Sequence, residues 1–327
     1  MTYEEAKEAF GRLFDGKMAP DAAKAMLTEM AERGESVDEI VAAAEVMRAH
    51  AVKLPVPDGL RDRLIDNCGT GGDKSGSFNI STTVSLLLAG AGCYVAKHGN
   101  RSITSRSGSA DMLEKLGIRL DLPPEKQVTM LEETGFAFLF AIHHHPAMKH
   151  VMPVRKSIPH RTIFNILGPL TNPAGVTKQF IGVFDPAFVE RIAEALKRLG
   201  SRRAMVVSSR DGLDEISLGD ATDAVVLEEG RLERTVIEPE ALGWRRQPLE
   251  AVKGGDAETN ARITRAVLHG EEKGPKRQIV LLNAAAALMV EGRAADLKEG
   301  LQIAEETIDS GRAAKALARI VDISNRL

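Results

Sequence analysis

Two glycine-rich loops, each between an apolar run and a helical pattern, constrain the fold of this 327-residue chain most strongly. The first unit reads LIDNC, GTGGDKSGSFN and ISTTVSLLLAGAG over residues 64–92, and the second reads CYVAK, HGNRSITSRSGS and ADMLEKLG over 93–117. Two consecutive strand–loop–helix units predict an α/β fold with a mostly parallel central sheet, in which both loops emerge at the carboxyl edge. Similar patterns predict further strands at 136–141, 180–184, 204–209 and 224–230, and further helices at 188–200, 257–270 and 279–292.

The first part of the chain has the pattern of helices. In three stretches before residue 52, apolar residues recur at intervals of three and four, and the two prolines of LPVP at 54–57 end that pattern. We therefore expect a small N-terminal all-helical domain over 1–63 and a large α/β domain over 64–327. The polar, proline-rich segment around 150–173 is expected to cross between them.

Charge and composition exclude several kinds of partner. Lysine and arginine number 43 against 46 aspartate and glutamate, which gives a net charge of −3, and aromatic residues make up 4% of the chain. Neither value suits a protein that binds nucleic acid. No stretch approaches the roughly 18 uncharged apolar residues of a membrane helix, and the acidic start is unlike a secretion signal. We expect a cytoplasmic protein with no membrane or nucleic-acid partner, whose Cys68 and Cys93 are buried reduced thiols.

The first glycine-rich loop has the composition of a phosphate site. Four glycines between residues 69 and 76 let backbone N–H groups approach an anion, and a helix expected to start near Asn79 adds free N–H groups. The loop matches neither common nucleotide motif, because Lys74 replaces the third glycine of GxGxxG and Asp73 precedes the Lys-Ser pair that would end a P-loop. A flexible surface turn is the alternative.

Two further loops are expected to face the same crevice. The second loop, from Lys97 to Asp111, carries cations, hydroxyls and glycines that suit a polyphosphate joined to a sugar, while helix capping also accounts for its last part. The adjacent carboxylates Asp214 and Glu215 follow a predicted strand and predict a Mg²⁺ site. A solvated acidic turn is the alternative for that pair.

The segment after the third predicted strand carries histidines and arginines. Three consecutive histidines at 143–145 lack the spacing of a zinc site, since neighbours in a strand or turn point in different directions. Arg155 and Arg161 are candidates to bind the carboxylate of an acceptor substrate, or else pair with surface acids. We find no Ser-His-Asp or Cys-His arrangement and assign no general acid or base.

Taken in order, the motifs resemble those of the anthranilate phosphoribosyltransferase family. They are GTGGD, NIST, KHGNRS with SGSAD, HPAMKHV, VR followed by RTIFNILGPLTNP, DGLDEIS, GGDAETN and LNAAAAL, and they cover nearly all of the chain from Leu64 onward. The resemblance implies the class III phosphoribosyltransferase fold and a homodimer paired through the N-terminal helices. It also implies a reaction, the second step of tryptophan biosynthesis, in which phosphoribosyl pyrophosphate and anthranilate give phosphoribosyl anthranilate and pyrophosphate. The implied cofactor is Mg²⁺, expected as two ions.

The resemblance assigns residues to both substrates and to the metal. For phosphoribosyl pyrophosphate it implies Gly69, Gly72, Asp73, Ser77, Asn79, Ile80, Ser81, Thr82, Lys97, His98, Gly99, Asn100, Arg101, Ser102, Ile103, Thr104, Ser105 and Ser109. For anthranilate it implies Gly69, Asn100 and Arg155, with His98 and His145 as residues of the acceptor channel. For the metal it implies Ser81, Asp214 and Glu215.

The sequence departs from the family pattern at three places. Lys74 stands where glycine is usual after GTGGD, Ser-Ile-Pro-His at 157–160 replaces the usual Glu-Leu-Gly run, and Ser-Ser-Arg at 208–210 precedes DGLDEIS. Two alternative functions are a pyrimidine nucleoside phosphorylase of the same fold and a non-catalytic relative that binds nucleic acid. RTIFNILGPLTNP and DGLDEIS favour the transferase over the first, and the net charge of −3 disfavours the second.

Overall fold

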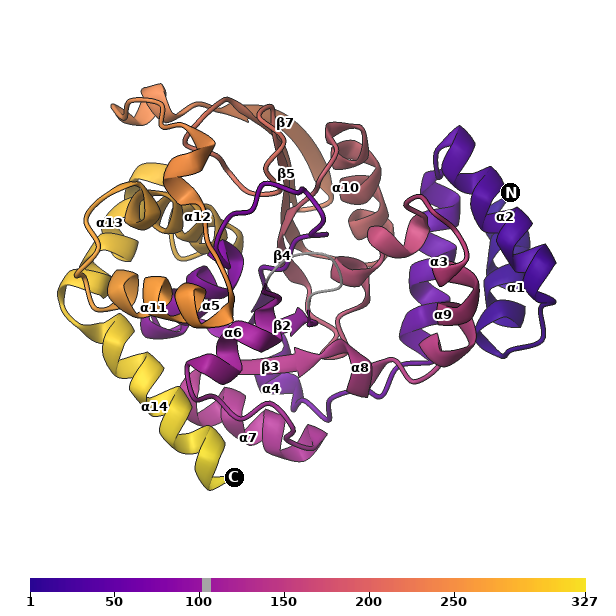
Figure 1. Ribbon diagram of the computed structural model, residues 1–327, viewed down its shortest axis with the longest axis horizontal. Coiled ribbons are helices and arrows are strands. Elements are labelled where there is room, and N and C mark those ends of the chain that lie inside the picture. The colour runs from indigo at the N-terminus through magenta and orange to yellow at the C-terminus, as the bar shows by residue number, and fades with distance from the viewer. Residues whose placement is uncertain (102–106) are drawn as a thin grey trace.

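A central sheet organises the large part of the molecule (Figure 1). The computed structural model describes residues 1–101 and 107–327. Within them the seven-stranded sheet has the order β3-β2-β1-β4-β5-β6-β7, and its first five strands are parallel. The strands are β1 (Leu64–Asp66), β2 (Tyr94–Gly99), β3 (Phe136–Phe140), β4 (Lys178–Gly182), β5 (Arg203–Ser209), β6 (Thr222–Glu228) and β7 (Arg231–Ile237). The predicted α/β fold with a mostly parallel sheet is confirmed.

The antiparallel edge of the sheet differs from the rest. Strand β6 pairs with both β5 and β7 in antiparallel register, so the chain turns back in a hairpin after Glu228. The sequence pattern did not predict β7, because most of its side chains are exposed and it has no apolar run. Its polar face suits an edge strand, which must not pair with another molecule.

Helices surround the sheet and also form a separate group at the N-terminus. The α-helices are α1 (Tyr3–Phe14), α2 (Pro20–Arg33), α3 (Val37–Ala49), α4 (Asp58–Arg61), α5 (Ile80–Gly90), α6 (Ser109–Lys115), α7 (Pro124–Thr134), α8 (Ala141–His144), α9 (Met148–Lys156), α10 (Val189–Arg198), α11 (Ala257–Leu268), α12 (Pro275–Glu291), α13 (Leu297–Asp309) and α14 (Arg312–Arg326). Short 3₁₀ helices are η1 (Ile163–Asn165), η2 (Gly168–Thr171), η3 (Pro186–Phe188), η4 (Pro239–Leu242) and η5 (Leu249–Val252). No helix in these described parts is long and apolar enough to cross a membrane.

The two faces of the sheet belong to two different apolar cores. Side chains alternate along a strand, so Val206 of β5 packs with α10 and the N-terminal helices, while its neighbour Val207 packs with α5, α12 and α13 on the other face. Helix α12 is buried on nearly every side, as its apolar sequence predicted. Burial on both faces explains why the parallel strands read as continuous apolar runs.

The N-terminal helices α1 to α3 form the small helical domain and receive a fourth helix from far along the chain. Helix α9 packs against α1 and α2, as Figure 1 shows at the right of the view. Nearby, the Phe14 and Phe164 rings meet edge to face with centroids 6.0 Å apart. The segment predicted to cross between the domains thus contacts the helical group directly. The domain boundary at residue 63 stays a prediction.

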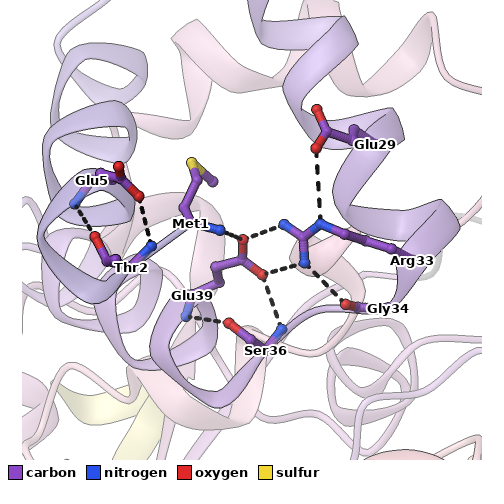
Figure 2. A network of polar contacts seen from close by, with 8 residues as sticks. All are labelled: Met1, Thr2, Glu5, Glu29, Arg33, Gly34, Ser36 and Glu39. Atoms are coloured by element: carbon purple, nitrogen blue, oxygen red, sulfur yellow. Dashed lines mark hydrogen bonds and ion pairs between the residues drawn. The ribbon is translucent and has the colours of Figure 1, made fainter.

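One buried carboxylate holds this helical group together at the start of α3 (Figure 2). The Glu39 side chain is fully buried and accepts hydrogen bonds from the Arg33 guanidinium, the Ser36 backbone and, at 2.9 Å, the Met1 amino group. Burial alone would raise the pKa of Glu39, but these donors lower it to about 2. Glu39 also completes a capping box with Ser36, so the same side chain fixes the start of the helix.

Replacement of glycine by alanine is expected to have opposite effects on stability at two helical positions. A Cβ at Gly300 of α13 would lie 2.7 Å from the carbonyl oxygen of Ala285, whereas a Cβ at Gly11 of α1 has no atom within 4 Å outside its own helix. We expect Gly11→Ala to raise the free energy of unfolding by about 0.5–1 kcal/mol, because alanine is the better helix former. Gly300→Ala should lower it by about 1–3 kcal/mol, because the clash with α12 outweighs that gain.

Chemical denaturation of both variants beside the parent chain measures this pair. Stabilisation by Gly300→Ala would show that α12 and α13 do not pack as closely as described.

Candidate functional site

Three loops meet at the carboxyl edge of the parallel strands. The first glycine-rich loop leaves β1 after Asp66, the second leaves β2 after Gly99, and the acidic loop 211–217 follows β5. Strand β4 lies between β1 and β5 and ends at Gly182. The predicted phosphate loops and acidic pair therefore share one edge, as expected for adjacent parallel strands.

The first loop and the acidic loop are in direct contact. The Gly71 N–H donates to Asp214 Oδ2 at 2.8 Å, and the Thr70 N–H donates to the Gly182 carbonyl at 2.9 Å. A Cβ at Gly182 would lie 1.6 Å from the Asp214 carbonyl oxygen, and one at Gly69 would lie 3.0 Å from Asp214 Oδ2. Only glycine at 182 allows the acidic loop to cross the end of β4 so closely.

The tip of the first loop presents unpaired backbone donors. Gly71, Gly72, Lys74 and Gly76 have φ angles of 66°, 78°, 61° and 70°, all in the left-handed region. The N–H groups of Gly72, Asp73 and Lys74 donate to no acceptor within the described residues. Successive N–H groups in such a conformation form an anion-binding concavity. Lys74 is strained in this conformation, which explains why glycine suits the position in the resembling family.

A second segment, residues 254–260, packs against this loop, and no residue of that segment was predicted to belong to the site. Asn260 of α11 donates to Asn79 Oδ1 at 2.9 Å and accepts the Gly255 N–H at 2.8 Å. A Cβ at Gly254 would lie 2.6 Å from Phe78 Cα, so the two backbones touch. The signal was present in the sequence as the motif GGDAETN at 254–260.

The remaining loop residues predicted to bind phosphoribosyl pyrophosphate fall into two groups. Ile80 and Thr82 are buried in the first turn of α5, so only their backbone groups can face a ligand, while Ser77 pairs with Lys253 in an isolated bridge. In the second loop, Ser109 Oγ donates to the Asn100 carbonyl at 3.0 Å, and a Cβ at Gly99 would collide with Ser109 and Phe138. Ser102, Ile103, Thr104 and Ser105 lie outside the described residues.

Three carboxylates gather where the loops meet. Burial, followed by the neighbouring charge of Asp73, raises the pKa of Asp214, and burial followed by the charge of Asp214 raises the pKa of Glu215. Asp73 Oδ2 is buried, and no donor among residues 1–101 and 107–327 forms a hydrogen bond with it. Glu215 lies beside the Ser81 backbone and the Lys97 ammonium. Negative charge at this point exceeds its local compensation.

Lys97 is a buried cation with few partners. Its side chain is 2% exposed, and Nζ donates to the Asn67 carbonyl at 3.3 Å. The neighbouring Asp66, fully buried at the end of β1, accepts from Asn172 Nδ2 at 2.8 Å and from the His98 N–H at 3.3 Å. No local sequence pattern marked Asp66 and Asn172, which hold the second loop where it leaves β2.

His98 and His145 form a buried pair. Their Nε2 atoms lie 3.2 Å apart, and His98 Nδ1 lies 2.9 Å from the Gly168 carbonyl. A carbonyl only accepts, so His98 donates through Nδ1 and its Nε2 accepts the His145 N–H. Burial lowers the pKa of His98 to about 3 and that of His145 to about 4, so both rings are neutral at pH 7. His145 Nδ1 has no hydrogen-bond partner among the described residues.

The two predicted ligand arginines, Arg101 and Arg155, have different surroundings. Arg101 is engaged with its own α6, donating to Asp111 at 2.9 Å and to Glu114 at 2.6 Å, so it does not converge with the first loop. Arg155 lies half-buried on α9, and no acid or carbonyl in the described chain accepts from its guanidinium. Burial lowers the pKa of Arg155, as expected for a cation without a counter-ion.

The metal ligands predicted from the sequence do not form a complete metal site by themselves. In residues 1–101 and 107–327, no three His, Cys, Asp or Glu side chains already have a metal-binding arrangement. Asp214 and Glu215 are adjacent, and Ser81 lies at the start of α5 beside Glu215. The assignment of these three residues stays a prediction.

Comparisons with known proteins agree with this architecture. A family model described as "Glycosyl transferase family, helical bundle domain" matches residues 1–51, and one described as "Glycosyl transferase family, a/b domain" matches 61–314. Fold and site together therefore define a glycosyl transferase.

Individual relatives narrow this class. The anthranilate phosphoribosyltransferase of Rubrobacter xylanophilus is 48% identical over 99% of this chain and 93% of its own length. The crystal structure of the Thermus thermophilus enzyme of that name is 46% identical, with a TM-score of 0.92 over 99% of this chain and 96% of that one. The Saccharomyces cerevisiae enzyme in complex with phosphoribosyl pyrophosphate and Mg is 26% identical, with a TM-score of 0.90 over 100% of this chain and 94% of that one. The chain belongs to the anthranilate phosphoribosyltransferase family.

Asn283 of α12 gives a prediction about how the acidic loop is held. This fully buried amide accepts from the Ile216 N–H at 2.8 Å and donates to the Ile216 carbonyl at 2.9 Å. Asn283→Ala should leave both groups of Ile216 buried and unpaired, and lower the free energy of unfolding by about 3 kcal/mol. Denaturant titration and amide exchange of residues 211–217 measure the effect.

Asn325→Ala is the matched control for this variant. Asn325 also donates from a helix to a distant carbonyl, that of Gly117 at 2.8 Å, but it is exposed and water can replace it. It should cost less than about 1 kcal/mol. Equal losses in the two variants would contradict the role of Asn283.

Proposed function

We propose that this chain transfers the phosphoribosyl group from phosphoribosyl pyrophosphate to anthranilate, giving N-(5-phosphoribosyl)anthranilate and pyrophosphate, the second step of tryptophan biosynthesis. Family membership over the whole chain supports the reaction. The observation that carries it best is the carboxyl edge of the sheet, where N–H groups with no acceptor among the described residues form a concavity beside three carboxylates. A pyrophosphate with a bound divalent cation complements both features.

The donor substrate is proposed to occupy the two loops that follow β1 and β2. Gly72, Asp73 and the first turn of α5 offer backbone N–H groups to its phosphates. Lys97 adds a buried ammonium with spare donors. The described residues proposed for this role are Gly69, Gly72, Asp73, Ser77, Asn79, Ile80, Ser81, Thr82, Lys97, His98, Gly99, Asn100, Arg101 and Ser109. Arg101 would have to leave Asp111 and Glu114 to take part.

The carboxylates fit a Mg²⁺ cofactor. Burial and the neighbouring carboxylates raise the pKa of Asp214 and Glu215, and no described residue donates to Asp73 Oδ2. A divalent cation bound there would stabilise the charged forms of these carboxylates. We propose that the site binds two Mg²⁺ ions and that Asp214, Glu215 and the Ser81 hydroxyl are their protein ligands. Mg²⁺ bound there would neutralise charge on the pyrophosphate.

The acceptor is proposed to bind on the side of α9. The Arg155 guanidinium has no acceptor among the residues that the structure describes, which suits the carboxylate of anthranilate. The neutral pair His98 and His145 would line the channel without adding charge, and Gly69 and Asn100 complete the proposed set.

The reaction exchanges one bond at the anomeric carbon for another. The bond to the pyrophosphate oxygen breaks with its electron pair leaving on that oxygen, the bond to the anthranilate nitrogen forms, and the amine releases one proton to water. Negative charge grows on the leaving group, so the N–H groups of the first loop and the Lys97 ammonium stabilise it more as the bond breaks. Arg155 orients the amine by holding the carboxylate beside it. No side chain is assigned as a general base.

Assembly and location are further parts of the proposal. We propose a homodimer paired through the N-terminal helices α1 to α3, supported by the family resemblance, and a cytoplasmic location, supported by the sequence composition. Light scattering after gel filtration would measure the mass of the assembly.

The carboxylate cluster predicts a link between pH and metal-dependent stability. A carboxyl group with a raised pKa in the folded state keeps its proton while the unfolded state loses it, so without metal its contribution to stability falls as pH rises above about 4. Mg²⁺ should therefore raise the melting temperature more at pH 8 than at pH 6. The double variant Asp214→Asn, Glu215→Gln should melt about 2 °C or more above the parent at pH 8 without metal, and lose the response to Mg²⁺.

Asp220→Asn provides the control for this experiment. Asp220 lies near the acidic loop but pairs on the surface with Arg246 at 2.6 Å, so its loss should leave the Mg²⁺ response unchanged. The same Mg²⁺ response in the double variant and the parent would refute the proposed metal site.

Arg155 predicts how the acceptor is held. The loss of anthranilate fluorescence on adding phosphoribosyl pyrophosphate and Mg²⁺ measures the reaction. Arg155→Ala should raise KM for anthranilate at least about thirtyfold. Without the guanidinium, the carboxylate of bound anthranilate has lost its partner, which costs about 2–5 kcal/mol of binding free energy. KM for phosphoribosyl pyrophosphate should stay nearly unchanged, and lysine should rescue only in part.

The neighbouring exposed cation is the control: Lys156→Ala should leave both constants unchanged. No consumption of anthranilate by the parent chain would refute the proposed function, and normal anthranilate saturation in Arg155→Ala would move the acceptor site elsewhere.

A further inference from the structure

Arg161 reaches from the segment after α9 to the tip of the first loop. Its Nη2 donates to the carbonyl of Gly72, and a Cβ at Gly72 would lie 3.6 Å from the same nitrogen. The guanidinium also lies over the ring of Phe184, 3.7 Å from the ring centroid. This one side chain therefore contacts both the loop and the chain that continues from β4.

The ring beneath Arg161 is itself connected to the loop. The Phe184 N–H donates to Thr70 Oγ1 at 3.2 Å, and the Thr70 N–H donates to the Gly182 carbonyl at 2.9 Å. Arg161 thus closes a ring of contacts that runs from Gly72 through Thr70 and Phe184 back to its own guanidinium. A flat guanidinium can stack on the ring and donate to a carbonyl in its plane at the same time, which an ammonium cannot.

The direction of one peptide group follows from this contact. The Gly72 carbonyl and the Asp73 N–H belong to the same planar trans peptide, so they point in opposite directions. When the carbonyl points at Arg161, the Asp73 N–H points away from it, and that N–H has no acceptor within the described part of the chain. If the peptide rotated, which the left-handed φ of 78° at Gly72 and the absence of a side chain make easy, a carbonyl oxygen would replace that donor.

We propose that Arg161 is a positioning residue for the donor substrate: it holds the Gly72–Asp73 peptide with its N–H available to the pyrophosphate and does not bind the acceptor. This inference rests on the proposed function. It separates two arginines six residues apart: no residue in the described part of the chain accepts a hydrogen bond from the Arg155 guanidinium, whereas that of Arg161 donates to the Gly72 carbonyl and lies over the Phe184 ring. The role requires the planar fork of arginine as well as its charge.

Amide exchange and ligand binding on purified full-length chain test this role. In Arg161→Ala without ligand, amides of residues 69–76 should exchange faster, and calorimetry with Mg²⁺ should show roughly tenfold weaker binding of phosphoribosyl pyrophosphate. KM for anthranilate should change less than about twofold. Arg161→Lys should recover only part of the binding. Phe184→Leu should weaken binding in the same direction, and the double variant should be no weaker than Arg161→Ala because the two side chains act as one unit.

Arg191→Ala is the matched control. Arg191 also donates to a backbone carbonyl, that of Glu35 at 3.2 Å, and lies over a phenylalanine ring, 5.6 Å from the Phe188 centroid. Neither contact involves a described residue of the site loops. It should change neither loop exchange nor binding of the donor.

Three results would overturn the proposal. Unchanged exchange of 69–76 in Arg161→Ala would mean that Arg161 does not hold the loop, and weaker binding without faster exchange would make it a direct ligand. A loss confined to KM for anthranilate would place it in the acceptor site. Failure of the proposed function is a separate result, seen as no turnover by the parent chain; loop exchange together with binding of pyrophosphate and Mg²⁺ still decides the role of Arg161.

Discussion

The close approach of the acidic loop to the end of β4 is the contact on which the site depends. Asp214 crosses Gly182 at a distance that no side chain at 182 would permit, and from there its carboxylate reaches the Gly71 N–H. A larger residue at 182 would displace the acidic loop. The first loop would then also lose the hydrogen bond between the Gly71 N–H and Asp214. The missing Cβ, and not a strong attractive interaction, brings the carboxylates and the phosphate loop into one place.

Amide side chains then hold the loops where the strands leave them. Asn260 supports the first loop, Asn172 binds the carboxylate at the end of β1, and Asn283 binds both backbone groups of Ile216. An amide both donates and accepts, so one buried side chain can satisfy a backbone N–H and a carbonyl that have left regular structure. Each of these residues lies outside the loop that it supports. The conformation of the site therefore depends on how distant segments of the α/β domain pack together.

The charged groups of the site are placed to bind a ligand, and they lower the stability of the ligand-free protein. Buried carboxylates with raised pKa values, the buried Lys97 ammonium and the Arg155 guanidinium, which has no acceptor in the described chain, all cost stability when no ligand is bound. The N-terminal helices show the opposite arrangement, since buried Glu39 is fully paired and its pKa is lowered to about 2. The contrast separates a carboxylate that stabilises the fold from carboxylates that are left for a cation.

Local patterns in the sequence predicted the parallel strands, the helices beside them and the two loops at their carboxyl ends, because apolar periodicity and missing side chains act over a few residues. Strand β7 was missed since an exposed edge strand needs no apolar run. Family motifs named Gly72, Asp214 and Arg155 as site residues, but nothing local distinguishes Arg155 from Arg161, or marks Asn172 and Asn283 as supports. Those differences depend on which distant segments the packing of the sheet and helices brings together: Gly72 and Phe184 contact the guanidinium of Arg161, while no described residue accepts a hydrogen bond from that of Arg155. The sequence by itself therefore determined the elements and their chemistry, and only the tertiary structure decided the partners, because a hydrogen bond or a stacked ring is set by three-dimensional distance and not by position along the chain.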